Sequence, residues 1–416
     1  MIVSFSVENF RSIRNKICLD FRATADDHLE EYLVVEIPKP KLRILKMAMI
    51  YGANASGKSN ILMALDFLRD LTLSPLKDKN IHLNLPSFAL DSSRPSTFEI
   101  EFYQRGVCYI YKIQLNKKRI LQETLHHYPK GHKAHIYSRI YDSITDEYDY
   151  KWTDRSYGKI LREKLQLTIP NQTILSSISS VDDKGSIQIA HDWFRFNLQN
   201  LLKPGHDLTR FVCNSYEQNR CNKEFLLPIL KKADFQISDI KYEKKTLKLG
   251  EFSDPKLSEI LEAIGEDKDD LRIDQHKLDL IHKSDAGDFI LNLHDESIGT
   301  QRFLGLSVIL ELVEKHNICL PIDEIDSSLH LDLIEFFILL FFKYSKHSQL
   351  LFTSHNVALL NKKNLLRRDT VWITDRLSDG STELTNVMDY PVRKEHAIDK
   401  LFMKGQIGGK PDIGVI

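Results

Sequence analysis

Short apolar runs along the chain predict the buried strands of an α/β fold. Residues 47–51, 318–322 and 349–352 are dominated by apolar side chains, and each run has the length of a strand rather than of a buried helix. Residues 60–68, which follow the first run closely, repeat apolar side chains at helical spacing. The pattern therefore predicts a strand, a loop and a helix near the start of the chain, and two more buried strands far downstream.

The long stretch between these runs shows other patterns. Alternating apolar and polar residues over 97–102 and 107–113 predict two strands that pair as a hairpin through residues 104–106. Residues 141–235 are expected to be mainly helical, whereas residues 236–295 return to strand and mixed signals. No heptad pattern is sustained over several turns, so no coiled-coil arm is predicted.

The loop after the first apolar run has the composition of a phosphate-binding loop. Residues 52–59 read Gly-Ala-Asn-Ala-Ser-Gly-Lys-Ser, a complete G-x-x-x-x-G-K-[ST] motif between a strand and a helix. Its two glycines let backbone N–H groups point at phosphate oxygens. We expect Lys58 to reach the β- and γ-phosphates and Ser59 to ligate Mg²⁺. The motif predicts an ATP site whose contacts from this segment are Asn54, Ala55, Ser56, Gly57, Lys58, Ser59 and Asn60.

Polar residues that end the two downstream strands suit the second half of such a site. Asp323 and Glu324 follow one apolar run, and His355 follows the next. Parallel strands bring their carboxyl ends to one edge of a sheet, so these side chains are expected to meet the phosphate loop there. Asp323 would then hold Mg²⁺, while Glu324 would orient or deprotonate the attacking water and His355 would reach the γ-phosphate.

These motifs together resemble those of the ABC-type ATPases, in the branch that contains SMC, RecF and OLD-like proteins. Residues 5–13 look like the opening strand of that branch, which implies that Arg11 approaches the nucleotide phosphates. Residues 323–330 resemble its Walker B motif and D-loop, with His330 where many ABC proteins carry Asp. His355 matches the switch histidine of these proteins.

The resemblance also implies a signature motif at the start of a helix upstream of Asp323. Residues 297–301, Ser-Ile-Gly-Thr-Gln, precede a stretch with apolar residues at helical spacing, although they depart from the usual LSGGQ. Ser297 and the amide of Gly299 would contact the γ-phosphate bound by a partner chain, which implies an ATP-dependent homodimer or higher oligomer. The alternative is that residues 297–301 are an ordinary helix N-cap.

Within this branch, the chain is most similar to the RloA/AbiL-like ATPases of bacterial phage-defence loci. It lacks long coiled-coil arms, and residues 401–411 are similar to the Gly-rich, Pro-ended terminus of that group. The alternative for these residues is a flexible chain end. The likeness implies an antiviral defence complex in which a second protein, such as a nuclease encoded nearby, is the effector.

Lys58 and Asp323 are far apart in the sequence, and this separation predicts the domain organisation of the chain. The fold class is α/β: an ABC-type ATPase head with a mixed sheet flanked by helices, interrupted by a large mixed α+β insertion. Residues 1–84 would form the first part of the head, residues 85–294 the insertion, and residues 295–416 the second part of the head.

The composition of the chain mainly argues against certain classes of protein. Lys and Arg number 57 against 58 Asp and Glu, so no overall basic charge indicates nucleic-acid binding, although a local basic surface stays possible. No apolar run approaches the length of a membrane span, and no signal segment is seen at the N-terminus. Five scattered cysteines favour a reducing compartment, so a cytoplasmic location without membrane association is expected.

Two classes of function fit these patterns. The first is a switch ATPase of an anti-phage defence complex, which dimerises with ATP and controls a separate effector protein. The alternative is a RecF- or SMC-like DNA-repair ATPase that clamps duplex DNA. The balanced charge favours the switch, and the sequence identifies neither its trigger nor its effector.

Overall fold

A computed structural model describes residues 1–38, 41–153, 158–178, 185–233, 235–248, 272–391 and 396–409. The chain divides into two compact units. The first comprises residues 1–204, 313–327 and 341–416, and the second comprises residues 205–312 and 328–340. The first unit contains the phosphate loop, and it is assembled from both ends of the chain.

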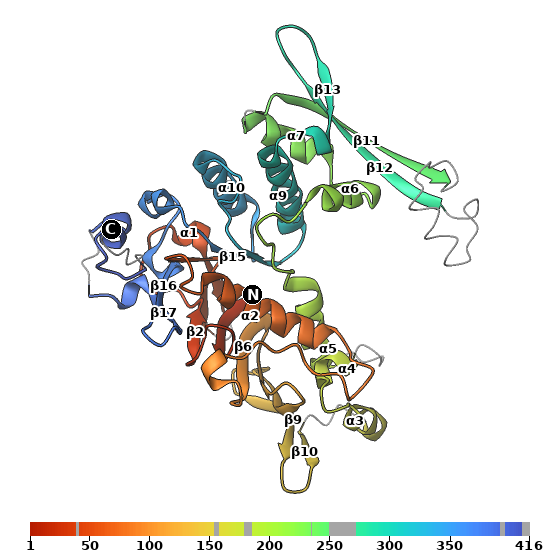
Figure 1. The fold of residues 1–416 in the computed structure, drawn as a ribbon, viewed down its shortest axis with the longest axis vertical. Helices are drawn as coiled ribbons and strands as arrows, with labels where there is room; N and C mark the ends of the chain where they lie inside the picture. Colours follow the sequence, from red (N-terminus) through yellow and green to blue (C-terminus); the bar gives the residue numbers. More distant parts are fainter. Residues whose placement is uncertain are drawn as a thin grey trace. The chain divides into compact units, whose positions relative to one another are not determined.

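A five-stranded sheet of the first unit carries the three buried strands that the apolar runs predict (Figure 1). In spatial order its strands are β14 (Cys319–Ile322), β15 (Gln349–Thr353), β5 (Met47–Gly52), β16 (Val371–Arg376) and β17 (Thr382–Asn386). The first four are parallel, and β17 is antiparallel to β16. Because β14, β15 and β5 are parallel, their carboxyl ends reach the same edge of the sheet, with β15 between the other two.

The second sheet of this unit is antiparallel and has seven strands. Their order is β10 (Glu147–Trp152), β9 (Ala134–Asp142), β8 (Ile120–His127), β7 (Val107–Leu115), β6 (Ser96–Gln104), β1 (Ile2–Glu8) and β2 (Ile17–Asp20). The predicted hairpin is confirmed as the β6–β7 pair. The prediction of helix from residue 141 onward is wrong at its start, where the chain forms β10 and pairs with β9. This pairing leaves the alternate residues Tyr148 and Tyr150 half-buried, which is a strand pattern.

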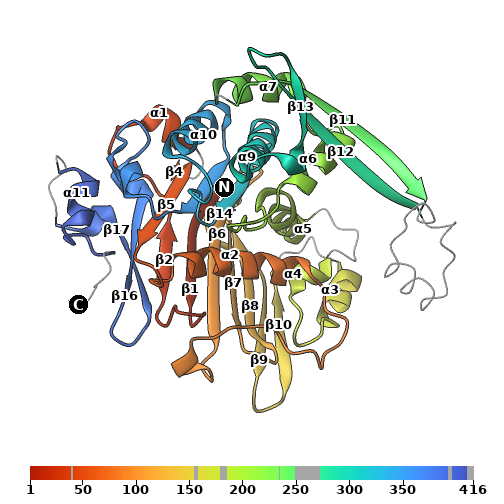
Figure 2. The same cartoon turned by 45° about the horizontal axis from the view of Figure 1, so that its top comes forward.

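Helix α2 (Lys58–Leu73) contacts both sheets of the first unit. It packs against β1 of the antiparallel sheet and against β5 and β15 of the parallel sheet, and Figure 2 shows it lying across the antiparallel strands. Its buried face is mainly apolar, with Ile61, Leu62, Ala64, Leu65 and Leu68 buried together with Thr72. The helix that begins at the phosphate loop is therefore held rigidly by the core.

Smaller elements complete the first unit. They are α1 (Glu30–Leu33), β3 (Val34–Ile37), β4 (Leu42–Leu45), α3 (Lys159–Gln166), α4 (Ile174–Ile178), α5 (Ser186–Asp192) and α11 (Ile398–Met403). A π-helical turn, Trp193–Asn197, continues α5 and buries Trp193 against Phe102, with ring centroids 4.2 Å apart. The helical segment that begins with α5 therefore ends at Asn197.

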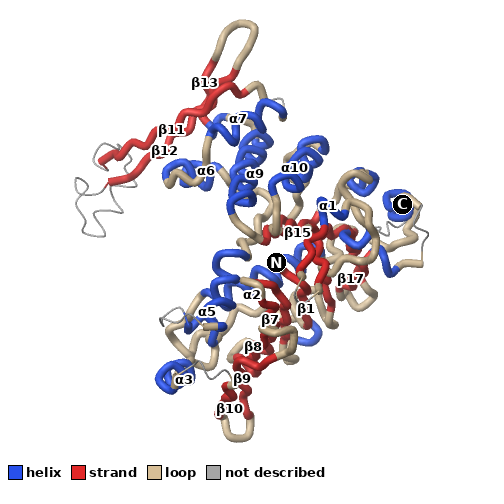
Figure 3. Tube along the Cα trace, turned by 180° about the vertical axis from the view of Figure 1, so that it is seen from behind, coloured by secondary structure: helices blue, strands red, loops and turns tan. Residues whose placement is uncertain are grey.

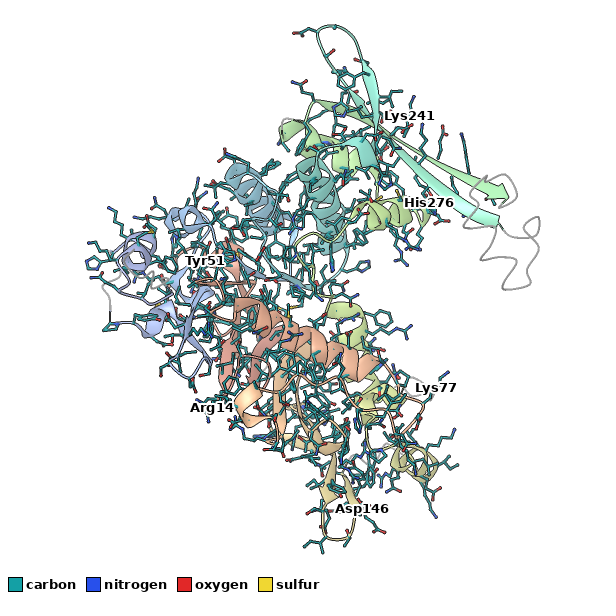
Figure 4. The ribbon with its side chains drawn as sticks, in the orientation of Figure 1. Arg14, Tyr51, Lys77, Asp146, Lys241 and His276 are labelled. Atoms are coloured by element: carbon teal, nitrogen blue, oxygen red, sulfur yellow. The ribbon has the colours of Figure 1, made fainter. Side chains whose placement is uncertain are left out.

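The second unit contains a three-stranded antiparallel sheet and helices. Its elements are α6 (Thr209–Glu217), α7 (Lys223–Lys232), β11 (Ile237–Lys248), β12 (Arg272–His282), β13 (Phe289–Asn292) and most of α9 (Ile298–Lys315) and α10 (Leu331–Tyr344). Strands β11 and β12 pair along their length as a ribbon (Figure 3). Within the described ranges β11 is an edge strand, and Lys241, labelled in Figure 4, is exposed on it.

The described helices show no coiled-coil arm, since the longest of them, α9, has 18 residues. No helix in the described part of the chain is both long enough and apolar enough to span a bilayer. The predicted fold class is confirmed in its architecture: a discontinuous α/β fold with a mixed sheet flanked by helices.

Candidate functional site

The phosphate loop joins a fully buried strand to the N-terminus of a 16-residue helix. Gly57 has φ +102°, and a Cβ there would lie 2.0 Å from Thr382 Oγ1 and 2.7 Å from Ser12 Oγ. A Cβ on Gly52 would lie 2.2 Å from Thr374 Oγ1. Both glycines are therefore required by close packing as well as by the turn, and the loop fits tightly against β16 and β17.

Lys58 is buried inside this loop. Its Nζ donates to the carbonyl oxygens of Gly52 and Ala53, each at 2.9 Å. Burial lowers the pKa of Lys58 to about 8, against an opposing effect of the nearby carboxylates Glu324 and Asp323. The ammonium group is thus poorly compensated, and an anion at the loop would stabilise it.

Asp323 joins the phosphate loop to the neighbouring strand. Its Oδ1 accepts hydrogen bonds from Ser59 Oγ at 2.9 Å and from Thr353 Oγ1 at 2.6 Å. Thr353, the last residue of β15, also accepts a hydrogen bond from the backbone N of Glu324 at 2.7 Å. A hydroxyl and a carboxylate held this close are oxygen ligands of the kind Mg²⁺ prefers.

Glu324 and His355 face each other at the same edge. His355 Nε2 lies 3.4 Å from Glu324 Oε1, and both side chains are more than one-third exposed. The backbone N of His355 donates to Asp326 Oδ2 at 3.1 Å. Glu324 has φ +47°, a left-handed conformation that non-glycine residues adopt rarely.

An open pocket of about 670 Å³ connects these groups, within the size range of small-molecule sites. Its lining residues are Asn54, Ala55, Gly57, Lys58, Ser59, Asn60, Glu324 and His355. Ser56 is buried beneath the loop, where its Oγ lies 2.6 Å from Thr374 Oγ1. The donor set fits a nucleotide phosphate, and Ser59 links the pocket to the buried carboxylate of Asp323, so that these two residues would hold a divalent cation.

Arg11 lies in the turn after β1, beside residues that contact the loop. It is exposed, has φ +50°, and its backbone N donates to Pro86 O at 2.6 Å. The next residue, Ser12, accepts a hydrogen bond from Asn60 Nδ2 at 2.7 Å. The turn is thereby fixed to the first turn of α2.

Ser297 and Gly299 belong to the second unit, whereas the other predicted site residues belong to the first. Ser297 is exposed at the start of α9, where its Oγ accepts a hydrogen bond from Thr300 N at 3.1 Å. A Cβ on Gly299 would lie 3.0 Å from Ser328 O, so this position is closely packed. Ser297 therefore caps α9, and its exposure leaves it accessible to a ligand as well.

Three residues that position the site were not predicted from the sequence. Thr353 holds Asp323 and Glu324, Asp326 holds the backbone of His355, and Thr382 Oγ1 donates to Ser56 O at 2.8 Å. Thr353 could have been noticed as a polar residue closing an apolar strand, and Asp326 as part of the acidic run after β14. Thr382 carries no such signal, because it is brought to the loop only by the fold.

The fold and this site define the class of protein: a phosphate-loop ATPase domain of mixed α/β architecture. The chain belongs to the family described as "AAA domain, putative AbiEii toxin, Type IV TA system", whose model matches residues 47–361. The match includes the phosphate loop, Asp323, Glu324 and His355. No curated protein matches the sequence.

Several solved structures are similar to the chain at low identity. One is the "SMC head domain from Thermotoga maritima", with 14% identity, a TM-score of 0.42, and coverage of 92% of this chain and 98% of that chain. Another is the "Crystal structure of the Smc head domain with an extended coiled coil bound to the C-terminal domain of ScpA derived from Pyrococcus furiosus". It has 13% identity, a TM-score of 0.42, and coverage of 97% and 98%.

Proposed function

We propose that this protein binds and hydrolyses ATP, and that ATP controls its association with other proteins in an anti-phage defence complex. The observation that carries the proposal is the convergence of Ser59, Asp323 and Glu324 beside Lys58, at the carboxyl ends of adjacent parallel strands. A strand that simply ends in solvent, or a Gly-rich turn without a ligand, would not require these three side chains to lie together.

Each residue has a defined part in the proposed reaction. Lys58 and the loop amides bind the β- and γ-phosphates of ATP, while Glu324 accepts a proton from the attacking water. His355, 3.4 Å from Glu324, orients that carboxylate and reaches toward the γ-phosphate. Arg11 adds positive charge at the edge of the site. Asp323 and Ser59 would hold Mg²⁺, which neutralises phosphate charge when bound.

A complete site is proposed to form between two chains. The exposed Ser297 and the amide of Gly299, at the start of an 18-residue helix, would face the γ-phosphate bound to Lys58 of a second copy. ATP would then join two copies into a homodimer, or into a higher oligomer built of dimers. Hydrolysis would release them.

The role in defence rests on the family to which the chain belongs, whose description names the AbiEii toxin and a type IV toxin–antitoxin system. The described residues contain no group of three or more His, Cys, Asp or Glu side chains suited to a metal centre of a nuclease. The proposed output is therefore a separate effector protein, bound in one nucleotide state and released in the other. Such coupling must be reciprocal and needs only a few kcal/mol.

The test uses purified full-length protein with a non-hydrolysable ATP analogue. We expect phosphate release with ATP, duplex-DNA binding that is weak at physiological salt, no nuclease activity, and nucleotide-dependent binding to the protein encoded beside it. Tight, salt-sensitive and ATP-dependent DNA binding by the isolated chain would instead support a repair clamp. Nuclease activity abolished by a substitution in this chain would overturn both assignments.

A further inference from the structure

The C-terminal segment packs against the strand that leads into the phosphate loop. Phe402 of α11 is buried, and its ring lies 6.4 Å from that of Tyr51, the residue before Gly52. The hydroxyl of Tyr51 in turn donates to Asn356 O at 3.2 Å, one residue beyond His355. Figure 2 shows α11 beside β17 of the first unit, and Figure 4 labels Tyr51.

Two glycines after α11 are closely packed, one against Asp375 of β16 and the other beside the first residue of the loop. Gly409 is buried, and a Cβ there would lie 3.3 Å from the Cα of Gly52 and 2.9 Å from Ile373 Cγ2. Gly408 is equally confined, since its Cβ would lie 2.0 Å from Asp375 Oδ2. Their φ angles are +72° and +68°, which other residues rarely adopt.

Asp375 fixes this contact from the adjacent strand. It lies near the end of β16, one residue after Thr374, which is paired with Gly52 in the parallel register. Asp375 Oδ1 accepts a hydrogen bond from the backbone N of Gly409 at 2.6 Å. The carboxylate therefore holds the Gly408–Gly409 pair beside the first residue of the phosphate loop.

Gly52 links the Gly408–Gly409 pair to Lys58. Gly52, whose Cα a Cβ on Gly409 would meet, presents its carbonyl oxygen to Lys58 Nζ at 2.9 Å. Thr374 Oγ1 also lies close to this glycine, since a Cβ on Gly52 would be 2.2 Å from it. A displacement of Gly52 by a few tenths of an ångström would therefore change the environment of the Lys58 ammonium directly.

We propose that Asp375 and the Gly408–Gly409 pair are positioning residues of the nucleotide site, which set the backbone of Gly52 for phosphate binding. The C-terminal segment is thus part of the ATP-binding machinery, although it follows the phosphate loop by more than 300 residues. The proposal rests on the proposed ATP-binding function. It adds that undocking the segment weakens nucleotide binding without unfolding the head.

The test compares two glycine substitutions that impose the same backbone strain. In Gly409→Ala, the new methyl group meets Phe402, Ile373 and the Cα of Gly52. In the control Gly380→Ala, φ is +80°, but the methyl group meets only Arg376 Nη2 at 3.7 Å, an ordinary contact. Affinity for a fluorescent ATP analogue and the melting temperature without nucleotide are measured for both full-length variants.

We expect Gly409→Ala to bind the analogue about tenfold or more weakly than Gly380→Ala, because small displacements of positioning groups cost this much or more. The melting temperatures of the two variants should be similar. A second pair removes the dependence on glycine: Asp375→Ala should weaken binding, whereas Asp375→Asn, which retains an acceptor for Gly409 N, should restore most of it.

The outcomes separate the two levels of the proposal. If the wild-type protein binds no ATP, the proposed function fails. If it binds ATP and Gly409→Ala and Asp375→Ala bind within twofold of Gly380→Ala, the positioning role alone is overturned. If Gly409→Ala lowers both the melting temperature and the affinity relative to Gly380→Ala, and Asp375→Asn does not restore binding, the segment has a purely structural role.

Discussion

The hydroxyl of Thr353 lies 2.6 Å from Oδ1 of Asp323, so the last residue of β15 holds the carboxylate that follows β14. Both side chains are buried, and Ser59 Oγ shares the same carboxylate oxygen. Adjacent parallel strands thereby fix the position of the proposed metal ligand. The geometry of the site is in this sense built into the sheet.

Replacing Thr353 tests that role. Thr353→Val keeps the shape but removes the donor to Asp323 and the acceptor for Glu324 N, and unsatisfied buried groups of this kind cost about 1–3 kcal/mol. We expect lower stability and a higher Mg²⁺ requirement for phosphate release, measured by denaturant unfolding and Mg²⁺ titration. Thr353→Ser retains the hydroxyl and should behave like wild type. An unchanged Mg²⁺ requirement in Thr353→Val would contradict the role.

The chemical step depends on Glu324 and substrate binding on Lys58. Glu324→Gln should bind ATP normally but release phosphate about 10²–10⁴ times more slowly, as expected for a lost general base. Lys58→Ala should lose nucleotide binding itself. Glu383→Gln, which neutralises an exposed carboxylate on β17, is the control and should be fully active. Wild-type turnover in Glu324→Gln would eliminate the assignment.

The dimer model makes a separate demand on Ser297. Asp is as good a helix N-cap as Ser, so Ser297→Asp should preserve α9 while placing a negative charge opposite the partner's γ-phosphate. Light scattering with ATP should show that Glu324→Gln is a dimer and that the double variant Glu324→Gln/Ser297→Asp is a monomer. The two variants should have equal thermal stability. Normal dimerisation of Ser297→Asp would mean that Ser297 only caps the helix.

The lowered pKa of Lys58 predicts how nucleotide affinity depends on pH. Burial holds this pKa at about 8 in the free protein, and a bound phosphate favours the charged form and raises it. Binding above pH 8 therefore takes up a proton, so affinity should be flat below pH 8 and fall above it by up to about tenfold per unit. Calorimetry in buffers of different ionisation enthalpy measures the uptake. Lys58→Arg stays charged throughout, and a pH dependence equal to that of wild type would exclude Lys58 as the titrating group.

Local patterns were sufficient for the elements that carry the chemistry. The phosphate loop, the strand before it and α2 are adjacent in sequence, so motif and apolar periodicity specify them together. The ends of β14 and β15 were also predictable, because apolar runs closing on Asp323 and on His355 are visible without any knowledge of the fold. The β6–β7 hairpin followed from simple alternation.

Only the tertiary structure decided which residues support that chemistry. Thr382 and Asp375 approach the phosphate loop because β16 and β17 extend the sheet beside β5, a pairing that no local pattern encodes. Gly409 similarly looks like part of a flexible tail until its contact with Gly52 is seen. Residue type and spacing determine what a segment can form, whereas strand order and close packing determine which distant segments meet. The reactive groups of this protein were therefore visible in its sequence, and the residues that position them were not.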